Sequence, residues 1–162
     1  MNRVVAFNSY DDPSGLERGN LLARVIIASV RLPVLGPVVA SLEPPPIMRA
    51  VLHGGFVEKS KLPEDFLVEL LRSGRREGYS TVARAIYRSL KGFNRARRRY
   101  PEVSAPVTLV YSERDWSRPA ERDQVASSLA DVQRITLSRT GHFSSLERPD
   151  DVARILLGAA AT

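Results

Sequence analysis

Two polar residues in the second half of the chain have the types and the sequence context of a catalytic pair. His142 follows a glycine and precedes an aromatic residue in the stretch RTGHFSSLERPDD. Asp115 lies in the stretch YSERDWSRP, four residues beyond Tyr111, which ends an apolar run. A carboxylate beside an imidazole fixes the tautomer of the ring and stabilises its protonated form, as a general base for a nucleophile requires. We therefore predict that Asp115 orients His142 as a general base.

Each of the two residues follows a predicted strand. The run Val107–Tyr111 is apolar almost throughout, which is typical of a strand buried on both faces in a parallel sheet. A second strand is predicted in VQRITLSRT, and His142 lies five residues beyond Leu137 of that strand. Because ligands bind beyond the carboxyl ends of parallel strands, adjacent strands would bring the loops of Asp115 and His142 together.

The order of the predicted elements indicates the fold class. A short apolar strand in residues 3–9 is followed by helical patterns from residue 16 to about residue 99. A strand, a helix, a second strand and a final helix then follow in turn. This order predicts an α/β protein with a parallel sheet of about three strands and a helical insertion between the first and second strands.

The composition narrows the classes of site that the chain can hold. Its 162 residues are 43% hydrophobic and 26% charged, which is typical of a globular protein. The absence of cysteine excludes disulfides and thiolate metal sites, and the two histidines, His53 and His142, are far apart in sequence. We therefore predict no metal site.

The charge and hydropathy patterns bear on partners and location. The net charge is +6, and four arginines fall within residues 94–100, but no aromatic platform or nucleic-acid motif accompanies them. We expect no nucleic-acid partner; an arginine-driven binder of nucleic acid or membrane surfaces is the alternative, and its affinity would fall steeply with salt.

The apolar stretch 21–42 is interrupted by Arg24 and Arg31, so no transmembrane segment is predicted. No signal peptide is visible, and we expect a cytoplasmic location.

Two stretches of the sequence together resemble a known family. PVTLVYSERDWSRP and TGHFSSLERPDDVARILL look like the last two strand-loop-helix units of the α/β-hydrolase fold family. In that family the acid follows one strand and the histidine follows the next, in the chain order nucleophile, acid, histidine. Asp115 and His142 match those two positions, and Glu147 matches the usual start of the last helix.

The resemblance implies a division of the chain and a class of reaction. Residues 1–10 would form the first core strand, residues 11–103 a helical cap or lid insertion, and residues 104–162 the C-terminal part of the core. The implied substrate is a small apolar ester, epoxide or halide-type compound. No cofactor is implied, because this chemistry uses only side chains and backbone N–H donors.

One feature of the family is missing from the sequence. The family carries its nucleophile on a strand-to-helix turn, usually within G-x-S-x-G, and this motif occurs nowhere in the chain. The expectation is therefore a truncated hydrolase, with the identity of its nucleophile, serine or aspartate, left open, and the isolated chain is not expected to carry out the reaction of the family by itself. The alternative is a non-catalytic α/β binding or interaction module that self-associates or pairs with a chain supplying further strands.

Several other residues are candidates for the site. Asp11 and Asp12 follow the first strand, where some relatives of the family place the catalytic acid; the other interpretation is a solvated turn. Trp116 and Phe143 flank the predicted pair in sequence, and Tyr87 lies in the predicted cap, where epoxide hydrolases of this fold use paired tyrosines. These three are candidate substrate-lining residues, and ordinary packing is the alternative for each.

Overall fold

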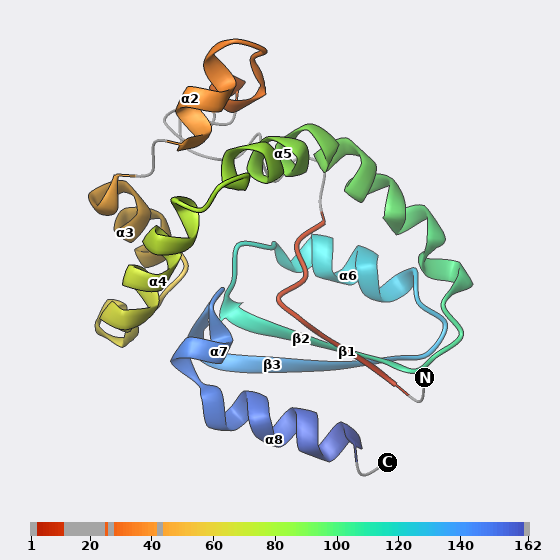
Figure 1. Ribbon diagram of the computed structural model, residues 1–162. Coiled ribbons are helices and arrows are strands. Elements are labelled where there is room, and N and C mark those ends of the chain that lie inside the picture. Colours follow the sequence, from red (N-terminus) through yellow and green to blue (C-terminus); the bar gives the residue numbers. More distant parts are fainter. Residues whose placement is uncertain (1–2, 12–24, 26–27, 42–43, 161–162) are drawn as a thin grey trace. The chain divides into compact units, whose positions relative to one another are not determined.

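The structure is a computed structural model that describes residues 3–11, 25, 28–41 and 44–160. Its strands are β1 (Val4–Phe7), β2 (Val107–Arg114) and β3 (Val132–Gly141). The α-helices with defined bounds are α2 (Leu35–Ser41), α3 (Pro45–His53), α4 (Glu64–Gly74), α5 (Tyr79–Ala96), α6 (Pro119–Ser127), α7 (Ser144–Glu147) and α8 (Pro149–Ala160). Two 3₁₀-helices are η1 (Lys59–Lys61) and η2 (Arg97–Glu102). The predicted α/β class is confirmed (Figure 1).

The three strands form one parallel sheet in the order β1-β2-β3. The central strand β2 is buried over its first six residues, as its continuous apolar run predicts. One face of β2 packs on α6, in a cluster formed by Val107, Leu109, Tyr111, Val125 and Ala126. Figure 1 shows α6 and α8 on opposite faces of the sheet. The register of the three strands sets where their carboxyl ends lie.

The strands β2 and β3 run further than their apolar sequences suggest. The apolar run ends at Tyr111, yet β2 continues to Arg114, and β3 continues to Gly141. Ladder hydrogen bonds are made by the backbone, so exposed polar side chains such as Arg114 do not end a strand whose neighbour is in place. Asp115 and His142 therefore follow their strands directly.

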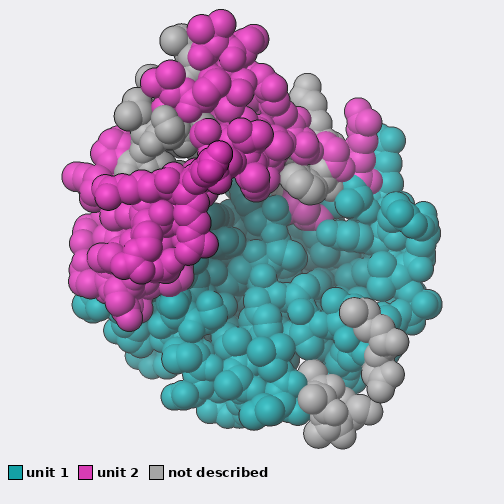
Figure 2. Space-filling model, viewed as in Figure 1, with its two compact units in different colours: residues 1–10, 52–62, 96–162 teal, residues 11–51, 63–95 magenta. Residues whose placement is uncertain are grey.

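The described chain divides into two compact units, coloured in Figure 2. Unit 1 contains residues 1–10, 52–62 and 96–162, and hence the whole sheet; unit 2 contains residues 11–51 and 63–95. Residues 52–62 and 96–103, which belong to the predicted insertion, thus lie in the unit that holds the sheet.

Unit 2 is held together in part by arginine side chains. Arg84 donates hydrogen bonds to the backbone carbonyls of Val30, Leu32 and Pro33, at 3.1–3.4 Å. Arg49 forms a two-pronged ion pair with Glu64, at 2.5 and 2.6 Å.

Within the part of the chain that the structure describes, no helix is both long enough and apolar enough to cross a membrane.

Candidate active site

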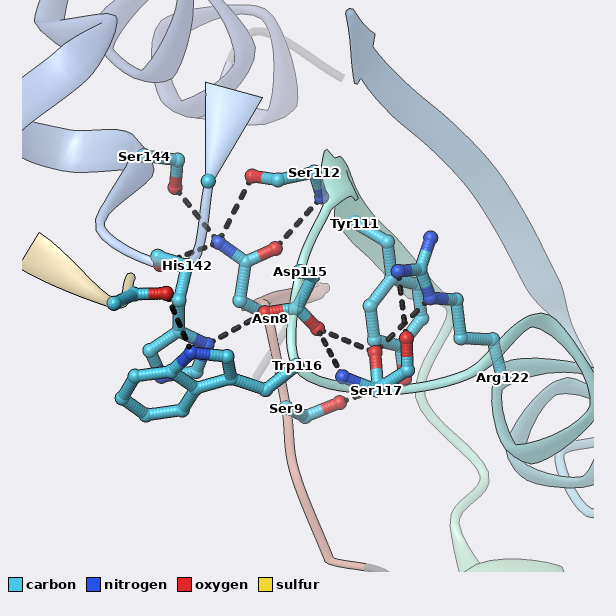
Figure 3. Close-up of polar contacts among 12 residues, drawn as sticks. Asn8, Ser9, Tyr111, Ser112, Asp115, Trp116, Ser117, Arg122, His142 and Ser144 are labelled. Carbon is cyan, nitrogen blue, oxygen red and sulfur yellow. Dashed lines mark hydrogen bonds and ion pairs between the residues drawn. The ribbon is translucent and has the colours of Figure 1, made fainter. Parts of the chain in front are cut away.

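The two residues predicted to act together lie in hydrogen-bond contact. Because β2 and β3 are parallel neighbours, the residues that follow them emerge at the same edge of the sheet. The Nδ1 atom of His142 lies 2.5 Å from Oδ1 of Asp115 (Figure 3). The side chain of Asp115 is fully buried, and that of His142 is 19% exposed. The structure thus joins, within unit 1, two side chains that are 27 residues apart in sequence.

The surroundings of Asp115 favour its ionised form. Its second oxygen, Oδ2, accepts hydrogen bonds from the backbone N–H of Ser117, at 3.2 Å, and from the Ser117 hydroxyl. Arg122 in turn donates to the Ser117 hydroxyl at 3.0 Å and to its carbonyl at 2.8 Å. Burial alone raises the pKa of Asp115, but the hydrogen bonds from His142 and Ser117 and the charge of His142 outweigh it and hold this pKa below its ordinary value.

With its carboxylate so placed, Asp115 fixes the tautomer of His142. An ionised carboxylate can only accept, so Nδ1 of His142 is the donor of their hydrogen bond. In the neutral ring, the other nitrogen, Nε2, is then the one that carries a free lone pair. No residue of the described chain forms a hydrogen bond with Nε2. This is the state in which an imidazole can accept a proton from a nucleophile.

Asn8, which the sequence analysis did not single out, ties three segments of the site together. Its side-chain amide nitrogen donates to the His142 carbonyl at 2.7 Å, to the Ser112 hydroxyl at 3.0 Å and to the Ser144 hydroxyl at 3.2 Å. Its amide oxygen accepts from the backbone N–H of Ser112, at 2.7 Å. Asn8 is buried and has a φ of 45°, a left-handed conformation that asparagine tolerates better than most residues. Its position directly after β1, at the same edge as Asp115, is the feature that could have identified it.

Glu147 attaches residues 57 and 58 to the segment 141–144, which contains His142 and is called the histidine loop below. Its side chain is buried, and Oε1 accepts hydrogen bonds from the backbone N–H groups of Val57, at 2.8 Å, and Glu58, at 2.9 Å. Its other oxygen, Oε2, accepts from the N–H of Gly141 at 2.5 Å. From the sequence alone, Glu147 is predicted only to lie at the start of the last helix. The structure shows that it joins residues 57–58, which belong to unit 1, to the residue before His142.

An aromatic cluster surrounds the His142 ring. Trp116 stacks on it, with ring centroids 3.9 Å apart and an interplanar angle of 14°. Phe143 meets both rings edge-on, at centroid distances of 5.4 Å to His142 and 5.7 Å to Trp116. His142 and Phe143 also help to line a pocket of about 270 Å³ in unit 1, together with Phe7, Asn8, Ser144, Ser145, Val152 and Leu156. A role for Trp116 or Phe143 against a substrate stays a prediction.

The remaining sequence-predicted candidates lie in unit 2 or outside the described residues. Asp11 belongs to unit 2, and Asp12 lies outside the described residues, so the carboxylate bonded to His142 is that of Asp115. Tyr87 lies in α5, in unit 2, and its backbone carbonyl accepts a hydrogen bond from Arg31 at 3.1 Å. Among the described residues, no cluster of three or more histidine, aspartate or glutamate side chains is arranged to hold a metal ion.

Comparison with solved structures finds the same arrangement of elements in several proteins. The Cfl2 protein from Burkholderia cenocepacia superimposes with a TM-score of 0.74 at 19% identity, covering 98% of this chain and 56% of its own. The Cif epoxide hydrolase from Acinetobacter nosocomialis gives 0.76 at 15%, covering 98% and 53%. The enol-lactonase from Burkholderia xenovorans gives 0.65 at 16%, covering 100% and 57%. The chain therefore spans about half the length of the structures that it matches.

These comparisons bear on the fold alone. No family model matches the sequence, and no curated protein matches it. At such low sequence identity, a structural match carries the architecture and not the substrate or the reaction.

Proposed function

This chain has the α/β-hydrolase fold over about half the length of its structural neighbours, and from that premise we propose that it carries the acid and histidine of a hydrolase. His142 acts as the general base, and Asp115 orients it. The proposal rests above all on the 2.5 Å contact between His142 Nδ1 and the fully buried Asp115 carboxylate. The proposed substrate class is a small apolar ester, epoxide or halide-type compound, in keeping with the epoxide hydrolase and the lactonase among the neighbours.

For an ester attacked by water, the reaction proceeds by two proton transfers at Nε2 of His142. Nε2 accepts a proton from the water as its oxygen attacks the carbonyl carbon. The proton then passes to the leaving alkoxide oxygen, which departs as the alcohol, and the ring becomes neutral again. With a hydroxyl nucleophile, the same two transfers first leave the acyl group on that hydroxyl, and a second round with water then releases the acid. Between these steps the imidazolium is stabilised by the Asp115 carboxylate through Nδ1. We assign the nucleophile to no residue of this chain.

The pair can be tested in the full chain without knowledge of the substrate. A histidine N–H that donates to a carboxylate gives a ¹H NMR resonance well downfield of the backbone amides. We expect one such resonance in the parent protein and its loss in both Asp115→Asn and His142→Gln. The matched control is His53→Gln, which alters the only other histidine and should leave the resonance in place.

Activity is tested with an activated ester such as p-nitrophenyl acetate. We expect slow hydrolysis that is reduced in His142→Gln and unchanged in His53→Gln. Equal rates for all three proteins would contradict catalysis by His142, whatever the NMR spectrum shows.

One observation favours a second function, a non-catalytic module that pairs with another chain or with itself. Among the described strands, β1 lies at an edge of the sheet. The backbone N–H groups of Val4 and Asn8 donate towards β2, so those of Val5 and Phe7 point to the opposite side. An unpaired strand edge is a template for a further strand. Concentration-dependent association in sedimentation velocity, without ester hydrolysis, would favour this module over the hydrolase.

A further inference from the structure

The contact between Trp116 and His142 is the most specific feature that the proposed mechanism leaves unused. Trp116 is the only tryptophan of the chain, and 39% of it is exposed. Trp116 is not one of the residues of the core cluster on the sheet, yet it lies nearly parallel to the imidazole at 3.9 Å. Its stacked contact is thus with the His142 ring and not with that cluster.

The indole is itself fixed by a second segment of unit 1. Its Nε1–H donates to the carbonyl of Gly54 at 3.2 Å, and the next carbonyl, that of Gly55, accepts from the N–H of Phe143 at 3.4 Å. A side chain at Gly55 would collide with the Phe143 ring, so this close approach requires glycine. Glu147 holds the same segment at Val57 and Glu58, three and four residues after Gly54. Trp116 is thus bonded to a segment that is already tied to the histidine loop.

A hydrogen bond at Nδ1 does not by itself fix the plane of an imidazole. Coupled changes of the two side-chain torsions can tilt the ring while Nδ1 stays within reach of the Asp115 oxygen, and such a tilt moves Nε2. An indole stacked on one face opposes that tilt. The face of the indole carries the negative side of its quadrupole, so the indole also attracts the imidazole when the imidazole is cationic. Both effects act on the position of Nε2, the atom that must meet the nucleophile.

We propose that Trp116 is a positioning residue for His142: it holds the imidazole in the plane in which Asp115 binds Nδ1, and it shields that hydrogen bond from water. This inference rests on the proposed function, because it concerns the same Asp115–His142 pair. Trp116 acts through His142 and needs no contact with a substrate.

Two substitutions separate the ring face from the anchoring N–H. Trp116→Phe keeps an aromatic face and loses the bond to Gly54, whereas Trp116→Leu loses both. In ¹H NMR spectra recorded between about pH 5 and pH 8, where an imidazole titrates, we expect Trp116→Leu to lose the downfield Nδ1–H resonance through faster exchange with water. We expect Trp116→Phe to retain it. Circular dichroism and thermal unfolding of both variants show whether each is folded.

The parent protein provides a second measurement that does not depend on the folding of a Trp116 variant. Imidazole quenches indole fluorescence on contact, and imidazolium quenches it more strongly. We expect the emission of Trp116 to be weaker in the parent than in His142→Gln, because that variant lacks the stacked imidazole. His53→Gln, the matched control, should emit as weakly as the parent.

The outcomes distinguish failure of this inference from failure of the proposed function. If the parent shows no downfield resonance, or if Asp115→Asn leaves that resonance unchanged, the Asp115–His142 pair itself is refuted. If the resonance depends on Asp115 but persists in a folded Trp116→Leu, the positioning role of Trp116 is refuted and the pair stands. Fluorescence that is the same in the parent and in His142→Gln at every pH would also overturn the inference, because the two rings would then not be in contact.

Discussion

Replacement of Glu147 tests whether one buried carboxylate holds the histidine loop to residues 57–58. Its two oxygens accept three backbone N–H groups, those of Val57 and Glu58 at Oε1 and that of Gly141 at Oε2. Glutamine has the same shape but only one acceptor oxygen. If that oxygen faces residues 57 and 58, the amide NH₂ group faces the N–H of Gly141, which then has no acceptor.

The magnitude follows from the number of bonds lost. A hydrogen bond to a charged group contributes about 1.5–3 kcal/mol, so we expect Glu147→Gln to lower the free energy of unfolding of unit 1 by about that amount. Glu147→Ala leaves all three donors without their acceptor, and we expect a loss of about 3–5 kcal/mol. This loss is a large part of the total stability of a typical domain, which is about 5–15 kcal/mol.

The assay is urea unfolding followed by the fluorescence of Trp116, which lies in unit 1 and is the only tryptophan. The matched control is Glu102→Gln, since the Glu102 side chain is 61% exposed and is paired at the surface with Arg99, 3.0 Å away. An exposed pair contributes about 0–1 kcal/mol. A loss for Glu147→Gln no larger than that for Glu102→Gln would refute the reasoning, because the bond from Gly141 to the carboxylate would then contribute no more than a surface charge.

Three further predictions concern the edge of the sheet where the site lies. The pKa of Asp115 is lowered in the folded state, so ionised Asp115 should stabilise unit 1 fully at pH values above its unfolded pKa of about 3.9. This stabilisation should be lost as the pH falls through the lower folded pKa. Urea midpoints measured against pH should show the loss in the parent and not in Asp115→Asn. We expect Asn8→Ala to destabilise unit 1 by about 2–4 kcal/mol, since it removes buried hydrogen bonds and places alanine at a positive φ. Asn8→Gly should destabilise it less, because glycine adopts a positive φ without strain. The same urea assay compares the two variants, and equal losses would contradict the role of the positive φ. Finally, the amides of Val5 and Phe7 should exchange with solvent faster than that of Asn8, which bonds to β2; hydrogen exchange by NMR measures this, and equal protection of all three would mean that the outer edge of β1 is paired.

The elements and the acid–histidine pair could be predicted from local sequence patterns. The apolar run of Val107–Tyr111 indicates a strand buried on both faces, and β2 occupies the middle of the sheet. Proline and acidic residues mark the starts of α4 and α8. Asp115 and His142 each follow a strand, and in a parallel sheet that position alone brings them to one edge. These inferences need only the periodicity of short segments and the geometry of parallel strands.

The supports of the pair could not be predicted in this way, because each joins residues far apart in sequence. Asn8 contacts the His142 carbonyl across 134 positions, and Glu147 contacts Val57 across 90. No local pattern distinguishes a buried asparagine or glutamate with several backbone partners from one that caps a turn or begins a helix. The division of the chain shows the same limit, since residues 52–62 have helical and glycine-rich patterns but are held to the sheet-containing unit by Glu147 and Trp116.

The sequence by itself thus determined the α/β order of elements and brought Asp115 and His142 to one edge of the sheet, since both depend on residue types and on short-range spacing. Only the tertiary structure decided how this pair is supported, with Trp116 on the face of the His142 ring and Asn8 at the His142 carbonyl. The physical reason is that a hydrogen bond or a ring stack depends on distances of a few ångströms between segments. Those distances are set by the packing of the whole unit and are not encoded in any one stretch of the chain.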